Sequence, residues 1–304
     1  PFPHAAMTVA LIAGTGGLPP HIAGRLMVQG RVPIICEMRG FPSKIKGEFT
    51  RIPFRIETLG SFLKTLTSLG VTQVCMAGAV QRPDIDPSAI DPETAPLVPR
   101  LMAAMAKGDD GTLREIITVF EEHGFTILGA HQIAPDLMPM TGVHTKASPP
   151  DLTAALDAAR IALADMARAD QGQAMLLRDG GVIAREDARG TAAMLQDFCN
   201  PVETDSIVDE LFGVFGEAIG GIADWLSGQD YTCAPGANAV LFKAPKPNQN
   251  MLADMPLIGP DTAMKAADAG LSGIVISSGG VMVLDLPQVV AILDAQGMFL
   301  WVHP

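Results

Sequence analysis

TVALIAGTGGLPPHIAGRLMVQ, residues 8–29, predicts a buried strand, a glycine turn and a helix, in that order. Residues 8–13 are all apolar or β-branched, as in strands that are covered on both faces. The glycines of the turn Gly14-Thr15-Gly16-Gly17 can adopt positive φ. A helix is expected to follow through about Gln29. A strand that enters a helix through a glycine turn is half of a βαβ unit, so this stretch predicts a parallel sheet.

The same alternation continues through the first part of the chain. Strands are expected over residues 32–37, 73–77 and 125–128, and helices over residues 61–69 and 113–123. Strands that alternate with helices predict right-handed crossovers. We therefore expect an α/β protein whose first domain, residues 7–134, has a Rossmann-like parallel sheet.

A second domain is expected after a linker. Residues 135–150 are rich in proline, glycine, threonine and serine, which is typical of an interdomain linker. Residues 151–304 are expected to form a C-terminal catalytic domain of mixed α/β type, with the ligand between the two domains. Its expected elements are a helix over 151–168, a hairpin around Asp179-Gly180, strands over 239–243, 273–276 and 281–284, and helices over 261–269 and 286–296.

The formal net charge of −12 argues against nucleic acid as a partner, because a phosphate backbone needs a basic surface. A single pyrophosphate remains a suitable ligand, since glycine-loop amides, one or two lysines and a divalent cation can hold it. No run of about 18 apolar residues predicts a membrane span. Residues 1–6 do not resemble a signal peptide, so we expect a cytoplasmic protein, with peripheral contact at the inner membrane as an alternative.

The four cysteines have no zinc-like spacing. Cys36 and Cys75 lie in apolar runs and are predicted to be buried thiols. Cys199 and Cys233 flank one segment, and a reduced pair is expected in a cytosolic chain.

The glycine turn allows three interpretations: a dinucleotide site, another phosphate or sugar contact, or plain turn chemistry. The dinucleotide fingerprint requires a third glycine where this chain has Pro19, and its acidic partner would have to be Glu37. A phosphate or sugar contact is therefore favoured over a nicotinamide-dependent oxidoreductase. Arg82 follows a predicted strand, where ligands of α/β sheets bind, and is a candidate for phosphate or uracil recognition, with a solvated loop arginine as the alternative.

Two further stretches carry charged residues near predicted element ends. Asp109 and Asp110 precede a helix, and either helix capping by Asp110 or Thr112 or a metal or ligand role is open. Lys243 and Lys246 lie on a proline-rich loop after a strand, where two ammonium groups can face one phosphate or form a basic surface.

DMPLIGPDT, residues 254–262, carries two further aspartates. Asp261 precedes a predicted helix and is a natural N-cap. Asp254 has no helix to cap, so it is a candidate to hold Mg²⁺ or Mn²⁺ or to orient an attacking water. His131 follows a strand and is interpreted as a packed histidine rather than a base.

Several motifs, in this order and spacing, resemble the LpxI-type UDP-2,3-diacylglucosamine pyrophosphatases of lipid A biosynthesis. The matching stretches are LIAGTGGLP (11–19), AGAVQRP (77–83), KGDD (107–110), LGAH (128–131), KAPKP (243–247) and DMPLIGPDT (254–262). The resemblance implies that water attacks the α-phosphorus of an acylated sugar nucleotide, giving UMP and 2,3-diacylglucosamine 1-phosphate (lipid X). It also implies dependence on Mg²⁺ or Mn²⁺.

The resemblance also implies roles for individual residues. Asp254, Asp261 and Lys243 are the expected catalytic residues, and Asp254 and Asp261 the expected metal ligands. The expected substrate-binding residues are Gly14, Thr15, Gly16, Gly17, Arg82, Lys246, Gln249, Thr191 and Thr262.

The chain departs from the family pattern in two places. Where the family has Glu-Gly-Thr-Asp-Ala-Met, residues 189–194 lack both carboxylates, with Arg189 and Ala192 in their places. A non-catalytic binder of a diacyl sugar phosphate or its nucleotide is therefore the alternative to an enzyme. Residues 197–238 are longer than the family norm and predict an apolar helical face. Core packing or a homodimer contact is one interpretation, and contact with acyl chains or the membrane surface is the other.

Overall fold

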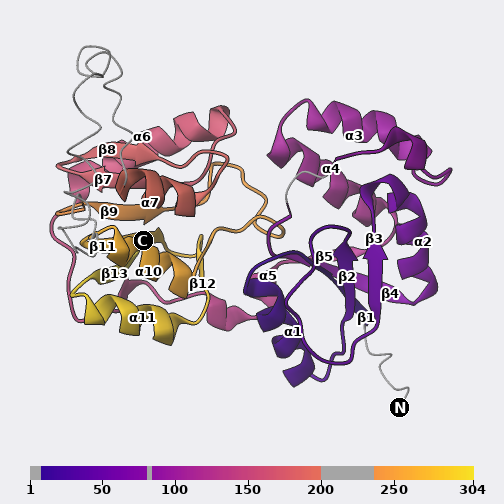
Figure 1. Ribbon diagram of the computed structural model, residues 1–304, viewed down its shortest axis with the longest axis horizontal. Coiled ribbons are helices and arrows are strands. Elements are labelled where there is room, and N and C mark those ends of the chain that lie inside the picture. Colours follow the sequence, from indigo (N-terminus) through magenta and orange to yellow (C-terminus); the bar gives the residue numbers. More distant parts are fainter. Residues whose placement is uncertain (1–7, 81–83, 200–235) are drawn as a thin grey trace, which may run out of the picture. The chain divides into compact units, whose positions relative to one another are not determined.

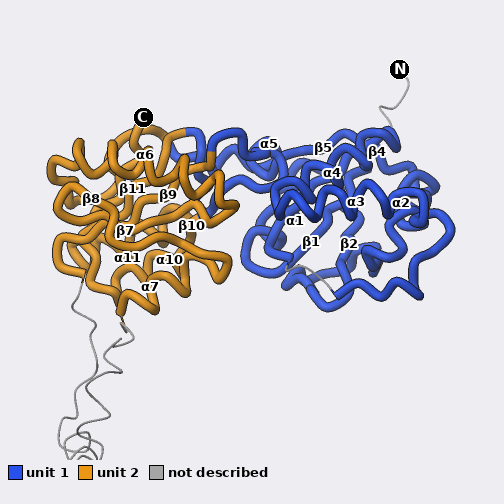
Figure 2. The backbone as a smooth tube through the Cα atoms, turned by 90° about the horizontal axis from the view of Figure 1, so that it is seen from above, with its two compact units in different colours: residues 1–139, 247–257, 279–284 blue, residues 140–246, 258–278, 285–304 orange. Residues whose placement is uncertain are grey.

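The computed structural model describes residues 8–80, 84–199 and 236–304 (Figure 1). Arg82 and the apolar face predicted within residues 197–238 lie outside the described residues, apart from the ends of that segment. The chain divides into two compact units (Figure 2). The N-terminal unit consists of Pro1–Pro139, Pro247–Leu257 and Gly279–Leu284, and the C-terminal unit of Met140–Lys246, Ile258–Ser278 and Asp285–Pro304.

A five-stranded parallel sheet organises the N-terminal unit. Its strands are β1 (Thr8–Ala13), β2 (Ile34–Met38), β3 (Arg51–Phe54), β4 (Val71–Ala77) and β5 (Thr126–Leu128), in the order β3-β2-β1-β4-β5. The chain builds outward from β1 to β3 on one side and from β4 to β5 on the other. The strand order therefore reverses between β1 and β4, which is where open α/β sheets bind ligands.

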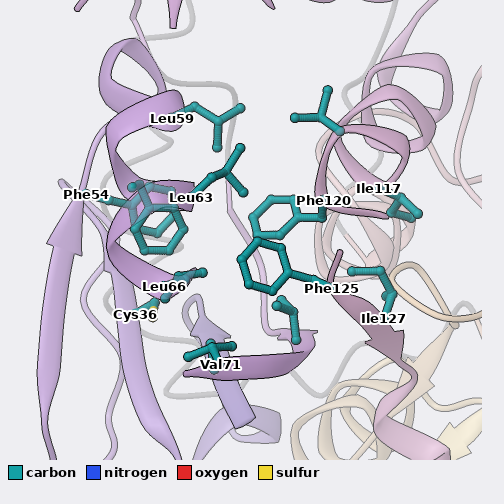
Figure 3. Close-up of a cluster of buried hydrophobic side chains, with 14 of the residues drawn as sticks. Cys36, Phe54, Leu59, Leu63, Leu66, Val71, Ile117, Phe120, Phe125 and Ile127 are labelled. Atoms are coloured by element: carbon teal, nitrogen blue, oxygen red, sulfur yellow. The ribbon is translucent and has the colours of Figure 1, made fainter. Parts of the chain in front are cut away.

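Helices cover both faces of this sheet, as the near-continuous burial of its central strands requires. α1 (Leu18–Val28) and α5 (Ala130–Ile133) pack on one face, and α2 (Leu59–Ser68), α3 (Val98–Met105) and α4 (Asp109–Glu122) on the other. Phe54 and Phe62 stack with ring centroids 4.2 Å apart, and Phe120 and Phe125 continue this aromatic core (Figure 3). The predicted Rossmann-like α/β fold is confirmed.

The predicted burial of two thiols is also confirmed. Cys36 on β2 and Cys75 on β4 are both fully buried. Loss of hydration raises the pKa of each thiol to about 12, so both stay protonated and act as small apolar groups.

Two short segments from the second half of the chain belong to the N-terminal unit, although the sequence analysis assigned them to the C-terminal domain. Leu252 and Ala253 pack against the core on the α2–α4 face, whereas Met255 and Leu257 pack on the α1 face. Leu284 joins the second of these cores. The second segment carries β12 (Met282–Val283), which pairs with β10 (Leu257–Ile258) at the end of the first segment in a two-stranded sheet.

A six-stranded mixed sheet organises the C-terminal unit. Its strands are β6 (Gly142–Val143), β7 (Ala174–Arg178), β8 (Gly181–Arg185), β9 (Val240–Lys243), β11 (Gly273–Ser277) and β13 (Phe299–His303), in the order β6-β13-β11-β9-β7-β8. The three central strands β13, β11 and β9 are parallel, and β6, β7 and β8 add antiparallel edges. β7 and β8 form the hairpin predicted around Asp179-Gly180, both of which have positive φ.

Within the described part of this unit, the helices that accompany the sheet are α6 (Thr153–Arg168), α7 (Thr191–Cys199), α10 (Pro260–Asp268) and α11 (Leu286–Ala295). α6 covers one face, and α10 and α11 lie on the opposite side (Figure 1). Four 3₁₀ turns complete the described elements: η1 (Ile56–Thr58), η2 (Pro87–Ala89), η3 (Ala95–Leu97) and η4 (Pro135–Leu137). Among the described helices none is long and apolar enough to cross a membrane.

A buried ion pair fastens the loop after β4 to the rest of the N-terminal unit. Glu57 is only 3% exposed, and its carboxylate accepts hydrogen bonds from Arg55 Nη2 at 2.6 Å and from the Asp86 N–H at 3.0 Å. The Glu57 carbonyl accepts the N–H of Asp91 at 3.1 Å. Hydrogen bonds from Arg55 lower the pKa of Glu57 to about 2, so the carboxylate is charged at all moderate pH values.

We predict that Glu57→Gln destabilises the protein by about 1–3 kcal/mol at neutral pH, because Arg55 then lacks a charged partner. A pKa that is lower in the folded than in the unfolded state stabilises the fold above the ordinary value of 4.5. This contribution is lost as the pH falls towards about 2. Urea unfolding across that range should show the difference between variant and wild type shrinking. Glu93→Gln, which breaks the exposed pair with Lys64, is the control and should cost about 0–1 kcal/mol.

Candidate functional site

Two glycine loops meet where the strand order of the N-terminal sheet reverses. The Thr15 N–H donates to the Ala79 carbonyl at 2.9 Å, and the Ala79 N–H donates to the Thr15 carbonyl at 3.0 Å. A Cβ on Gly14 would lie 2.5 Å from the Ala79 oxygen, and one on Gly78, whose φ is +87°, would lie 2.6 Å from the Thr15 oxygen. Only glycine fits at these two positions, because the backbones of the two loops touch.

The exposed residues of this turn have few backbone N–H groups that can donate to a ligand. Thr15, Gly16 and Gly17 are exposed, and α1 begins immediately after them. Pro19 and Pro20 occupy the first turn of α1 and have no N–H, so the turn can offer a ligand only N–H groups that precede them. The turn therefore suits a single phosphate or sugar contact better than the pyrophosphate of a dinucleotide.

Glu37, which would have to bind a ribose in a dinucleotide site, has other partners. Its Oε1 accepts hydrogen bonds from the Ser43 N–H at 2.9 Å, the Ser43 hydroxyl at 2.6 Å and Arg51 Nη1 at 3.2 Å. Glu37 therefore ties the loop after β2 to β3.

Asp254 lies in the N-terminal unit and is held by Gln249. The Gln249 side-chain N–H group donates to Asp254 Oδ2 at 2.7 Å and to the Asp254 carbonyl at 2.6 Å. The structure thus brings together two residues that the sequence analysis assigned to catalysis and to substrate binding.

Asp254 lies at the same edge of the sheet as the glycine turn. Its neighbours Ala253 and Met255 pack on opposite faces of the sheet, so the chain crosses the sheet edge between them. Arg114, near the start of α4, donates to the Asn248 carbonyl. α4 leads into β5, so its start lies beyond the carboxyl ends of the parallel strands, where the glycine loops also lie.

Two predicted helix caps are wrong. α4 begins at Asp109 with Gly108 as its N-cap, so Asp110 and Thr112 lie inside the helix instead of capping it. Gly108 has a φ of +99°, a conformation that glycine reaches without strain. α10 likewise begins at Pro260 with Gly259 as its N-cap, and Asp261 lies in the first turn. In both helices a carboxylate in the first turn still complements the helix dipole.

His131 lies in α5, directly after β5. Its half-buried ring packs over Gly129, where a Cβ would lie 2.5 Å from the ring. Loss of hydration lowers the pKa of His131, so the ring is neutral at moderate pH. The structure therefore supports the interpretation of a packed histidine.

The C-terminal unit contains a buried chain of polar side chains at the end of β9. Lys243, the last residue of β9, is 7% exposed, and its Nζ donates to the Thr191 hydroxyl at 3.1 Å. Thr191, the first residue of α7, donates its hydroxyl proton to Glu186 Oε1 at 2.6 Å. The structure thus brings together Lys243 and Thr191, which the sequence analysis assigned to one site, and adds the buried carboxylate of Glu186.

The other predicted residues of this unit lie apart from that chain or on its margin. Lys246 Nζ contacts Asp170 Oδ1 and the Gln171 carbonyl, each at 3.1 Å, and so has different partners from Lys243. Asp261, which is exposed, and Thr262 lie in the first turn of α10. α10 contacts α7, the helix that begins at Thr191.

The two positions at which the chain lacks the carboxylates of the family motif lie around the start of α7. Arg189 binds the carboxylates of Asp187 and Asp197 at 2.7 and 2.5 Å, and these hydrogen bonds raise its pKa further. Ala192 is exposed in the first turn of α7, next to Thr191. Both positions lie within two residues of Thr191, whose hydroxyl contacts Lys243 and Glu186.

The predicted metal ligands do not form a metal site in either unit. Asp254 belongs to the N-terminal unit and Asp261 to the C-terminal unit. Within residues 8–80, 84–199 and 236–304, no three histidine, cysteine or acidic side chains gather as metal ligands. Asp254 Oδ2 also accepts the hydrogen bond from Gln249. The assignment of Asp254 and Asp261 as ligands of Mg²⁺ or Mn²⁺ therefore remains a prediction.

A cavity of about 390 Å³ in the C-terminal unit lies away from these residues. Val240, at the start of β9, and Ser272, just before β11, line it. Lys243 is at the other end of β9, beyond which ligands of parallel strands bind. We therefore place the candidate site of this unit at Lys243 and not at the cavity.

Glu186 is the residue of this site that the sequence analysis missed. It directly follows β8, where a glutamate is most often a solvated strand end. Its burial depends on the pairing of β8 with β7 and on the position of α7, which no local pattern of residues encodes.

Both units thus carry polar side chains beyond the carboxyl ends of parallel strands. This placement is typical of α/β proteins that bind nucleotides or phosphates. Family models of the LpxI N-terminal domain and the LpxI C-terminal domain match residues 8–137 and 140–301. The chain belongs to the LpxI family, and the resemblance seen in its sequence motifs is confirmed.

A relative from Caulobacter vibrioides supports the same assignment. That protein, named UDP-2,3-diacylglucosamine pyrophosphatase LpxI, is 34% identical over 296 residues, which cover 96% of this chain and 95% of the relative.

We predict that Gly78→Ala destabilises the protein more than Gly70→Ala does, by at least about 1 kcal/mol. Both glycines have positive φ, but a Cβ on Gly70 meets no atom within 4 Å, whereas one on Gly78 meets the Thr15 oxygen. Gly70→Ala therefore reports the conformational cost alone, about 1–2 kcal/mol. Urea denaturation measures both variants, and equal losses would show that close contact between the loops is not a constraint.

Proposed function

We propose that this protein hydrolyses the pyrophosphate of UDP-2,3-diacylglucosamine in lipid A biosynthesis. Water attacks the α-phosphorus, the bond to the bridging oxygen breaks, and the products are UMP and 2,3-diacylglucosamine 1-phosphate. Membership of the LpxI family along the whole matched length and the name of the Caulobacter vibrioides relative support this substrate.

The buried Lys243 is the observation that carries the proposal in the C-terminal unit. A pyrophosphate is strongly anionic, and a lysine ammonium in a poorly hydrated place binds such an anion more strongly than one in water. Lys243 is 7% exposed and lies at the carboxyl end of β9. We assign it to a phosphate oxygen, where it stabilises charge that develops as the bridging bond breaks.

Asp254 is the proposed essential carboxylate. It lies at the edge of the N-terminal sheet that also carries Gly14, Thr15, Gly16 and Gly17, and Gln249 fixes its orientation. A carboxylate held in this way can accept a proton from the attacking water. We assign the glycine turn to the nucleotide, Lys246, Thr262, Arg82 and Gln249 to other polar groups of the substrate, and Thr191 to the support of Lys243.

Dependence on Mg²⁺ or Mn²⁺ rests on the family resemblance, since the described side chains of each unit do not provide a ligand set. A divalent cation would offset the charge of the pyrophosphate.

A binder of the intact substrate is the second candidate, and the neighbourhood of Thr191 favours it. Arg189 and Ala192 replace two carboxylates there, and Arg189 is engaged by Asp187 and Asp197. If one of the replaced carboxylates were required for the chemistry, this chain would bind the substrate and release nothing.

The experiment that separates these functions is a turnover assay with UDP-2,3-diacylglucosamine in ¹⁸O-labelled water, with Mn²⁺, with Mg²⁺ and with EDTA. We expect UMP that carries one ¹⁸O, because the attack is at the α-phosphorus, and little product in EDTA. Label in the lipid phosphate would show attack at the other phosphorus. Bound substrate without product would establish the binder instead, and full activity in EDTA would remove the metal from the proposal.

We predict that Asp254→Asn lowers kcat by about 10²–10⁴-fold. The asparagine amide oxygen can still accept the hydrogen bond from Gln249, so the substitution removes charge and basicity more than shape. Glu48→Gln, which also removes one negative charge from an exposed loop of the same unit, is the control and should keep full activity. A normal kcat for Asp254→Asn would refute the assignment.

A further inference from the structure

Two hydrogen bonds connect Lys243 to Thr191 and Thr191 to Glu186. We infer that Glu186 is a positioning residue, which acts through the Thr191 hydroxyl to hold the Lys243 ammonium where it binds a substrate phosphate. This inference rests on the proposed function of Lys243 and extends it to a residue that does not itself touch the substrate.

The hydrogen bonds have only one consistent direction. Lysine can only donate, so the Thr191 oxygen accepts from Lys243 Nζ at 3.1 Å. The Thr191 proton is then directed to Glu186 Oε1, which lies at the short distance of 2.6 Å. The hydroxyl thus links a buried ammonium to a buried carboxylate, and the negative charge of Glu186 stabilises the positive charge of Lys243.

Glu186 is itself firmly held. Its Oε2 accepts the N–H groups of Gln173 and Ala174 at 2.7 and 2.9 Å, and its own N–H donates to the Ala174 carbonyl at 2.9 Å. Its side chain lies directly over Gly172, where a Cβ would come within 2.3 Å of Glu186 Cγ. With 6% of its surface exposed, Glu186 cannot move without breaking the start of β7.

A fixed anchor matters because a lysine side chain is long and has many rotamers. Without the hydrogen bond to Thr191 the Lys243 ammonium would be less well oriented, and without Glu186 its buried charge would be less well compensated. The bond to Thr191 uses one of the three ammonium donors and sets the direction of the group at the end of β9. Glu186 and Thr191 therefore prepare Lys243 before the phosphate binds, so less free energy is spent on ordering it.

The test is a double-mutant cycle on the affinity of the full chain for UDP, which carries both phosphates of the substrate's pyrophosphate, measured by calorimetry. We expect Lys243→Met and Glu186→Gln each to weaken UDP binding by about tenfold or more. In the Lys243→Met background, Glu186→Gln should cause less than about a twofold further loss, because Glu186 acts through the lysine. If the two substitutions weaken UDP binding independently, so that their fold-losses multiply in the double variant, the inference is wrong.

Substitutions of Thr191 provide a second route should Glu186→Gln fail to fold. Thr191→Val keeps the shape but removes the hydroxyl, and should weaken UDP binding by about tenfold in wild type and by less than about twofold in the Lys243→Met background. Thr191→Ser keeps the hydroxyl and should bind UDP almost as wild type does. Equal effects of valine and serine, or the same loss in both backgrounds, would contradict the link.

Two controls distinguish failure of the inference from failure of the proposed function. Lys265→Met, on the exposed side of α10, should leave UDP affinity unchanged. UMP release is measured separately, so a coupled cycle without turnover would keep the positioning role and remove the hydrolytic reaction. No UDP binding by the wild-type protein would overturn both the phosphate contact and the inference.

Discussion

A positive charge buried at the end of β9 is the constraint on which the candidate site depends. An ammonium taken out of water requires negative charge nearby, and Lys243 obtains it from Glu186 through Thr191. This requirement fixes the start of α7 against the β7–β8 hairpin and joins three separate elements at one point. The same arrangement, which stabilises the unit when no ligand is bound, leaves a prepared cation where a phosphate can bind.

The constraint in the N-terminal unit is different, because it is the close steric contact between two loops. The loops after β1 and β4 touch through their backbones, and only glycine at positions 14 and 78 allows the contact. The contact holds the exposed residues of the turn beyond the sheet, while residues 252–257 cross the same edge and bring Asp254 there.

Local sequence patterns predicted the structure correctly where it depends on the pattern within single helices, strands and turns. The alternation of apolar strands and amphipathic helices predicted the Rossmann-like sheet, and Asp179-Gly180 predicted the hairpin. The same reasoning failed at the helix starts, where Asp110 and Asp261 were expected as caps but Gly108 and Gly259 occupy those positions. A cap depends on the φ and ψ of a single residue, and the helices begin earlier than predicted, α4 at Asp109 instead of residue 113 and α10 at Pro260 instead of residue 261.

The sequence by itself determined the α/β class and the family, because hydrophobic period, glycine placement and motif order are local properties of the chain. Only the tertiary structure decided that Asp254 belongs with the N-terminal sheet and that Glu186 is buried behind Lys243. The physical reason is that both facts depend on contacts between residues far apart in sequence. Residues 247–257 join cores most of whose members lie before residue 140, and Glu186 loses its hydration only when β7, β8 and α7 come together.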